Sequence, residues 1–191
     1  MYKHKNGITL RKIEFYDLTK LKELKNESWF GTHNINILND YEQNIWFEKI
    51  NWEKNMFLIA YSEKEKVDVG VYKIQNIDWI NRKYDSAHDI FKESRGKGYS
   101  KPVLEAGIDF GFEILNINRI DTEVLENNIA SLKSALHVGF VKEGVKRKSI
   151  NKCNEYLDSI FLGSLREEWV KLRKNKYNGV CNNSYKPKNN I

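Results

Sequence analysis

The beginning of the chain shows hydrophobic patterns typical of a strand, two helices and a second strand. Residues 8–13 alternate apolar and polar side chains, which predicts a strand. Asp17 and Asp40 each precede an amphipathic stretch that they can cap, so we expect two helices, separated by an Asn- and Gly-rich loop over 29–39. Residues 56–61 are a compact apolar run and predict another strand. The apolar positions of the two helices are Leu18, Leu21 and Leu24, then Ile45, Trp46, Phe47 and Ile50.

The remainder of the chain continues with alternating strand and helix patterns. Strands are expected over 67–77, 84–91, 119–125, 140–150 and 156–162, and helices over 103–115 and 128–138. The predicted order is therefore β-α-α-β-β-β-α-β-α-β-β. Such an order indicates a mixed α/β sheet with helices on both faces. A length of 191 residues with 40% hydrophobic residues suits one domain with one core.

The positive charge of the chain is concentrated at its end. The net charge is +6, and the segment 171–191 alone holds six basic residues and no acidic one. The remainder is formally neutral, so a nucleic-acid partner is not expected. We predict one domain over 1–174 and a basic, flexible tail over 175–191.

Several protein classes are not expected from the sequence. No apolar run is long enough to span a bilayer, and the first residues lack the apolar segment of a signal peptide. The two cysteines, Cys153 and Cys181, have neither the number of a disulfide framework nor the spacing of a zinc site. We expect a cytoplasmic protein with no metal and no membrane association.

A glycine-bearing segment between a predicted strand and the long predicted helix carries the candidate chemistry. It reads Arg95-Gly96-Lys97-Gly98-Tyr99-Ser100. A helix N-terminus presents unpaired amide groups and partial positive charge, and glycines let an anion approach the backbone. Pro102 is compatible with a first helical turn. The spacing matches neither a Walker P-loop nor the GxGxxG of a dinucleotide fold.

This segment resembles the acetyl-CoA motif of the GNAT superfamily, (Arg/Gln)-x-x-Gly-x-(Gly/Ala), with Ser100 in the last small position. Flanking motifs resemble the RimJ/RimL-type branch over about residues 7–170. They are Asn81-Arg82, Asn118-Arg119-Ile120, Asn128-x-x-Ser131, Gly139-Phe140, Glu143-Gly144, Tyr156-Leu157-Asp158 and Leu165-Arg166-Glu167-Glu168-Trp169.

The resemblance implies a GNAT fold, a central sheet splayed in the middle that holds acetyl-CoA between two strands. The pyrophosphate is then expected on the amides of Gly96, Lys97, Gly98, Tyr99 and Ser100, beside Arg95. Pantetheine is expected to pair with the backbone around Phe91, with Asn128 and Ser131 near the thiol. Such a reaction needs a deprotonated amine, a held thioester and a donor for the oxyanion.

The sequence offers several candidates for the groups that move protons. Many family members carry a Tyr four residues before the Gly-Phe pair, where this chain has Ala135. Candidate bases are Asp85 and His88, which should point to opposite faces of their strand. Each has the competing interpretation of an ordinary surface or core residue. His33 and Trp29, in the loop where the family builds its acceptor pocket, are candidate substrate-binding residues.

These features predict an acetyl-CoA-dependent N-acetyltransferase for a primary amine of a small molecule: an amino sugar on a nucleotide, a polyamine or an aminoglycoside. A homodimer is a further expectation. The alternatives are acetylation of a protein N-terminal amine, a GNAT module that binds acyl-CoA without turnover, and a nucleic-acid partner recruited by the tail. A polyamine should require an acidic pocket, and a nucleotide-linked sugar should require Lys or Arg.

Overall fold

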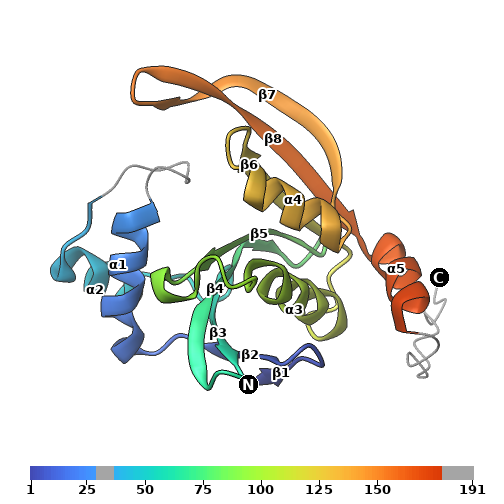
Figure 1. The fold of residues 1–191 in the computed structure, drawn as a ribbon, viewed down its shortest axis with the longest axis horizontal. Helices are drawn as coiled ribbons and strands as arrows, with labels where there is room; N and C mark the ends of the chain where they lie inside the picture. The colour runs from blue at the N-terminus through green and yellow to red at the C-terminus, as the bar shows by residue number, and fades with distance from the viewer. Residues whose placement is uncertain (29–36, 178–191) are drawn as a thin grey trace.

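The computed structural model describes residues 1–28 and 37–177, with side chains described to residue 173, and shows a mixed α/β fold (Figure 1). The strands are β1 (Tyr2–Lys3), β2 (Ile8–Lys12), β3 (Met56–Ser62), β4 (Val67–Asp78), β5 (Lys83–Ile90), β6 (Arg119–Leu125), β7 (Val141–Lys152) and β8 (Glu155–Leu165). The α-helices are α1 (Leu18–Ser28), α2 (Asp40–Glu48), α3 (Ser100–Glu113), α4 (Ile129–Val138) and α5 (Arg166–Tyr177). Short 3-10 helices precede α1 and α3: η1 (Phe15–Asp17) and η3 (Lys92–Ser94).

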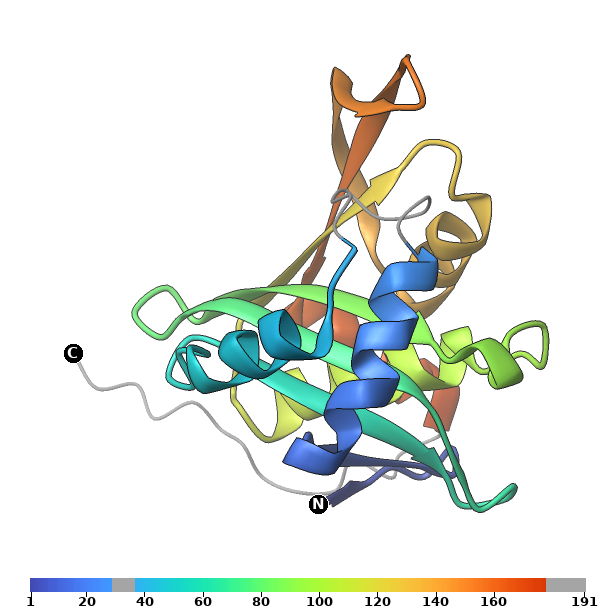
Figure 2. The same cartoon turned by 90° about the vertical axis from the view of Figure 1, so that its left-hand side faces the viewer.

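The strands form one sheet in the order β1-β2-β3-β4-β5-β6-β8-β7. All neighbouring pairs are antiparallel except β5 and β6, which are parallel and pair only from Lys83–Asp85 to Arg119–Asp121. Next along the two strands, the Thr122 hydroxyl donates a hydrogen bond to the Ser86 carbonyl at 2.9 Å. Beyond it the two strands diverge, and Figure 2 shows the β6–β8 part of the sheet turning away from the rest. The predicted splayed sheet is therefore present, and the split lies between β5 and β6.

Helices cover both faces of the sheet, as predicted. One core cluster joins the sheet to α3, α4 and Trp169 of α5. The other joins the opposite face to α1, and Trp46 and Phe47 of α2 pack against it while remaining half-buried. These faces follow from strand alternation, since neighbouring residues of β5 point to opposite sides. The split in the sheet therefore lies between a face covered by α3 and α4 and a face covered by α1 and α2.

Helix α3 packs close to the sheet because two of its residues, Gly107 and Gly111, have no side chain. A methyl group on Gly107 would overlap the ring of Tyr72, and one on Gly111 would overlap Tyr84. The two tyrosine hydroxyls are 3.0 Å apart and buried beneath the helix. This packing fixes the distance between α3 and the sheet, and it thereby positions the loop that precedes the helix.

Every predicted strand and helix is present, with bounds that differ by up to three residues, and the structure adds a strand at the start of the described chain and a helix at its end. Strand β1 and helix α5 were not predicted, because two residues carry no periodicity and α5 is mostly polar. Helix α5 also runs three residues into the predicted tail over 175–191. The cap of α2 is Asn39, whose side chain accepts from the Glu42 N–H at 2.9 Å, rather than Asp40. Within the described part of the chain, no helix is long and apolar enough to cross a membrane.

Candidate active site

The loop before α3 adopts the backbone that its glycines allow. Gly96 and Gly98 have φ angles of 74° and 83°, in the left-handed region that other residues rarely adopt. A Cβ at either position would meet no atom within 4 Å. Both glycines therefore present open backbone to a cavity of about 570 Å³ at the α3 N-terminus.

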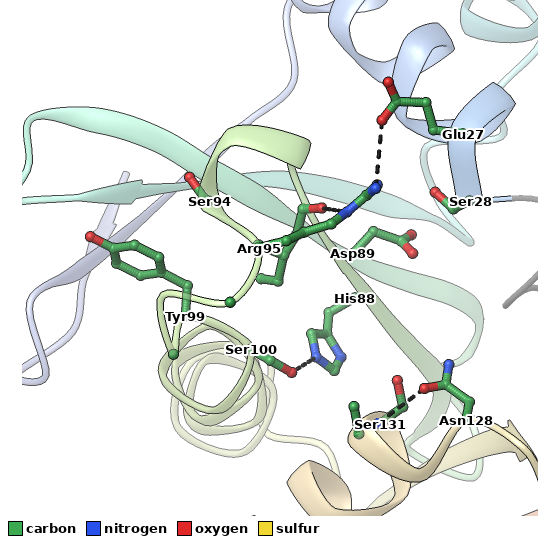
Figure 3. Close-up of a pocket in the computed structure, with 14 residues that line it drawn as sticks. Glu27, Ser28, His88, Asp89, Ser94, Arg95, Tyr99, Ser100, Asn128 and Ser131 are labelled. Carbon is green, nitrogen blue, oxygen red and sulfur yellow. Dashed lines mark hydrogen bonds and ion pairs between the residues drawn. The ribbon is translucent and has the colours of Figure 1, made fainter.

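This cavity gathers most of the predicted site residues. Its lining includes His88, Arg95, Gly96, Gly98, Tyr99, Ser100, Asn128 and Ser131. The elements that supply them are the end of β5, the loop before α3, the first turn of α3 and the start of α4 (Figure 3). The site therefore lies where the split in the sheet meets a helix N-terminus, a combination that favours an anionic ligand.

Arg95 and Asn128 hold the cavity in shape. The Arg95 Nε donates to the Ile90 carbonyl at 3.1 Å, and a guanidinium nitrogen lies 3.5 Å from a carboxylate oxygen of Glu27 in α1 (Figure 3). The Asn128 side chain accepts from the Ser131 N–H at 3.2 Å and so caps α4. Arg95 thus ties the loop to β5 and α1, while Asn128 orients the α4 N-terminus.

His88 points from β5 toward α3. Its Nε2 lies 2.7 Å from the Ser100 hydroxyl, which donates onward to the Ser134 hydroxyl at 3.1 Å. Burial lowers the pKa of His88 to about 4, and the charge of Asp89, which acts in the opposite direction, does not compensate. The imidazole is therefore neutral at ordinary pH, and it lies on the cavity side of the strand.

The other predicted residues lie outside this cavity. Asp85 faces the opposite side of β5, where it accepts from the Asn76 amide at 2.8 Å. Lys97 lines a neighbouring hollow instead. The Phe91 N–H already donates to the Val69 carbonyl at 3.0 Å, so it is not free to pair with a ligand. Trp29 and His33 lie outside the described residues. Their roles stay predictions.

Because Phe91 is bonded to β4, strand alternation turns the backbone groups of His88 and Ile90 toward the split. Ala135, at the position where many relatives of the resembled family carry Tyr, is 2% exposed and lines the recess between β5, β6 and α4. No side-chain proton donor can come from residue 135.

The sequence did not single out Asp89, which lines three adjoining cavities at the split. Its carboxylate lies 2.5 Å from the Lys73 Nζ on β4. Burial acts to raise the pKa of Asp89, but the charge and hydrogen bond of Lys73, together with smaller effects of His88 and Arg95, hold that pKa below its usual value. The register Lys73↔Ala87 makes Lys73 and Asp89 diagonal neighbours, and only correct strand pairing reveals this contact.

A family model described as an acetyltransferase (GNAT) domain matches residues 8–141. The chain therefore belongs to the GNAT acetyltransferase family. This confirms the predicted class, an N-acetyltransferase that uses acetyl-CoA. The match to the RimJ/RimL-type branch is not tested by this family model.

Two curated relatives and one solved structure are similar over most of the chain. An uncharacterized N-acetyltransferase p20 of Bacillus licheniformis is 28% identical over 85% of this chain and 95% of its own length. Spermidine N(1)-acetyltransferase of Vibrio cholerae is 25% identical over 72% of this chain and 80% of its own. A crystal structure of spermidine N-acetyltransferase from Vibrio cholerae with CoA and spermine has a TM-score of 0.79 and 20% identity, covering 87% of this chain and 99% of that one. The structural likeness confirms the predicted fold.

Proposed function

We propose that this chain transfers the acetyl group of acetyl-CoA to a primary amine of a small molecule at the split between β5 and β6. The observation that carries the proposal is one continuous cavity in which the α3 N-terminus, the open glycine backbone and the end of β5 converge. An anionic cofactor with a long extended arm fits this arrangement, because the phosphates need amide donors and the arm needs a free strand edge.

The donor is expected to bind through backbone groups. Amides between Gly96 and Ser100 would hold the pyrophosphate. The backbone groups of His88 and the N–H of Ile90, which face the split, would pair with pantetheine in place of Phe91. The thioester would then lie near Asn128 and Ser131, which line the cavity at its α4 side. The backbone N–H of His88, which faces the split, would also be placed to donate to the oxyanion.

The reaction is the transfer of an acetyl group from a thioester to an amine. The amine nitrogen attacks the thioester carbonyl, the new N–C bond forms, and the C–S bond breaks with the electron pair leaving on sulfur. The amine proton must leave, and the thiolate must gain one. Neutral His88 is positioned to accept a proton directly or through water, while Asp89, with its lowered pKa, is better suited to hold the incoming ammonium group.

The acceptor is a small molecule in this proposal, and the similarity to spermidine N-acetyltransferases supports that class. Amino sugars on nucleotides, polyamines and aminoglycosides remain the candidates. We further propose membership of the RimJ/RimL-type branch, action in the cytoplasm and assembly as a homodimer. Acetylation of a protein N-terminus is the second function within the same chemistry.

The test measures free thiol released from acetyl-CoA with a panel of small amines and N-terminal peptides. We expect turnover of at least one small amine and slower turnover of the peptides. Calorimetry with acetyl-CoA is the companion measurement. Tight acetyl-CoA binding without turnover of any amine would instead identify a non-catalytic acyl-CoA-binding module.

A further inference from the structure

A second pocket, of about 190 Å³, opens between α1, α2 and the β4–β5 face and adjoins the split. Its polar lining consists of Lys25, Ser28, Gln43, Lys73, Gln75 and Asp89. Trp46 and Phe57 form an apolar wall, with ring centroids 4.9 Å apart. Since Asp89 also lines the donor cavity, this pocket is the approach to the thioester from the face opposite α3.

The charges of this pocket do not balance. Lys73 is paired with Asp89 at 2.5 Å, and that carboxylate is the only acidic group among the described residues that line the pocket. Lys25 forms no ion pair with any residue in the described ranges. Partial burial, and then the charge of Lys73, lower the pKa of Lys25. With two ammonium groups against one carboxylate, the pocket disfavours any further cation.

Gln43 adds a hydrogen-bonding group that lacks a partner. The residue is 4% exposed, lines the pocket, and makes no side-chain hydrogen bond within the described part of the chain. Because the side chain faces the pocket, its amide is available to hydrogen-bond a ligand or water that enters. Residues 29–36, which follow α1 in sequence, contain no Asp or Glu that could supply a countercharge.

We propose that Lys25, Gln43 and Lys73 form an anion subsite and that the acceptor is a primary amine bearing a carboxylate or phosphate group. This inference rests on the proposed function and specifies its substrate class. The anionic group would lie between the two ammonium groups with the Gln43 amide as a further donor, while Asp89 holds the amine toward the thioester. Trp46 and Phe57 would pack against the body of the acceptor.

A competing acidic hollow lies on the other side of Ala87, over the paired part of β5 and β6. Among the described residues it holds four carboxylates, Asp85, Asp121, Glu123 and Glu143, against one guanidinium, that of Arg119. Asp121 and Glu143 bond to Arg119, at 2.7 Å and 2.9 Å, and Asp85 accepts from the neutral Asn76 amide. This hollow is net negative and would suit a polyamine, but it shares no lining residue with the donor cavity, whereas the Lys25 pocket shares Ser28 and Asp89 with that cavity. A preference for spermidine is the opposite outcome, and the same assay detects it.

The experiment compares matched amines at equal concentration by thiol release. One pair is glucosamine 6-phosphate with glucosamine, another is tryptophan with tryptamine, and spermidine is the cationic probe. We expect at least one anionic member to exceed the counterpart that lacks the anionic group by about 10-fold or more in kcat/KM, the scale of one charged hydrogen bond. The first pair reports phosphate recognition and the second reports carboxylate recognition.

Variants of Lys25 connect the preference to this pocket. Lys25→Gln should lower kcat/KM for the favoured anionic amine about 10-fold and leave the value for the counterpart without the anionic group within about 2-fold. Lys25→Arg should retain the preference, and Lys25→Glu should reverse it toward spermidine. The control is Lys64→Gln in the exposed β3–β4 turn, which should behave as wild type.

The outcomes separate this inference from the proposed function. Equal rates within both pairs, or a spermidine preference that Lys25→Glu does not alter, would overturn the anion subsite while leaving acetyl transfer intact. If no amine is turned over, the proposed function fails. Calorimetry of glucosamine 6-phosphate and tryptophan on the CoA-loaded protein then decides: loss of binding in Lys25→Gln supports the subsite, and no Lys25-dependent binding overturns it.

Discussion

The imidazole Nε2 of His88 lies 2.7 Å from the hydroxyl of Ser100, the first residue of α3. This contact joins the strand edge of the proposed thioester site to the helix that carries the phosphate-binding loop. The Ser100 hydroxyl donates onward to Ser134 in α4, so β5, α3 and α4 meet through one chain of polar groups. Asp85, the other candidate base, has no place in this chain, because it faces the opposite side of β5 and bonds to Asn76.

The first prediction follows from this asymmetry. His88→Gln should lower kcat by about 10- to 100-fold with acetyl-CoA affinity kept within a few-fold, the usual scale for losing help in proton transfer. Asp85→Asn should stay within about 3-fold of wild type. Steady-state kinetics and calorimetry on both variants make the comparison. A large loss in Asp85→Asn with none in His88→Gln would reverse the assignment.

The second prediction concerns pH. Because burial lowers the pKa of His88 to about 4, its imidazole is neutral above that pH, and only below it does protonation remove the base. An acid limb of kcat/KM near or above about pH 7 must then arise from the amine acceptor itself. We expect this limb to move when an acceptor of lower pKa is used and to persist in His88→Gln. A limb that is fixed across acceptors and absent from the variant would contradict this explanation.

The third prediction tests the donor site with two substitutions of equal size. Asn and Asp both tolerate positive φ, and a Cβ at Gly98 meets no atom within 4 Å, so either variant should fold. Gly98→Asp places a negative charge where the pyrophosphate is expected and should abolish acetyl-CoA binding. Gly98→Asn should weaken it less, by steric crowding alone. Equal affinity of wild type and Gly98→Asp, measured by calorimetry, would remove the donor site from this loop.

The sequence predicted most of the fold but less of the acceptor side of the site. Strand β6 was predicted at its observed bounds, because alternation and clear flanking turns define it, whereas polar α5 gave no periodic signal. The glycine loop was found because its residues are contiguous. Lys25, Lys73 and Asp89 come from three elements and meet only after β4 pairs with β5 and α1 packs against them, so no local pattern links them.

The fourth prediction concerns the packing of α3. Gly107→Ala forces a methyl group into the ring of buried Tyr72 and should destabilise the protein by about 1–3 kcal/mol, as overpacking usually does. Gly144→Ala on β7 is the matched control, since nothing lies within 4 Å of its Cβ, and it should change stability little. Urea unfolding followed by far-UV circular dichroism gives both values. Equal stability of the two variants would mean that α3 can shift away from the sheet at no cost.

The last prediction separates helix α5 from the segment that follows it. Arg173 is 4% exposed, and its guanidinium bonds to Glu105 at 2.9 Å and to Asp109, whose carboxylate also accepts from the Trp169 indole at 2.7 Å. Arg173→Gln removes the cation from two buried carboxylates and should cost about 3–5 kcal/mol of stability. Deleting residues 178–191, beyond the end of α5, should leave both the melting temperature and the acetylation of a small amine unchanged. A large loss of turnover in the truncated protein, with its melting temperature unchanged, would show that residues 178–191 recruit the acceptor. A protein or nucleic-acid substrate would then be favoured over a small amine.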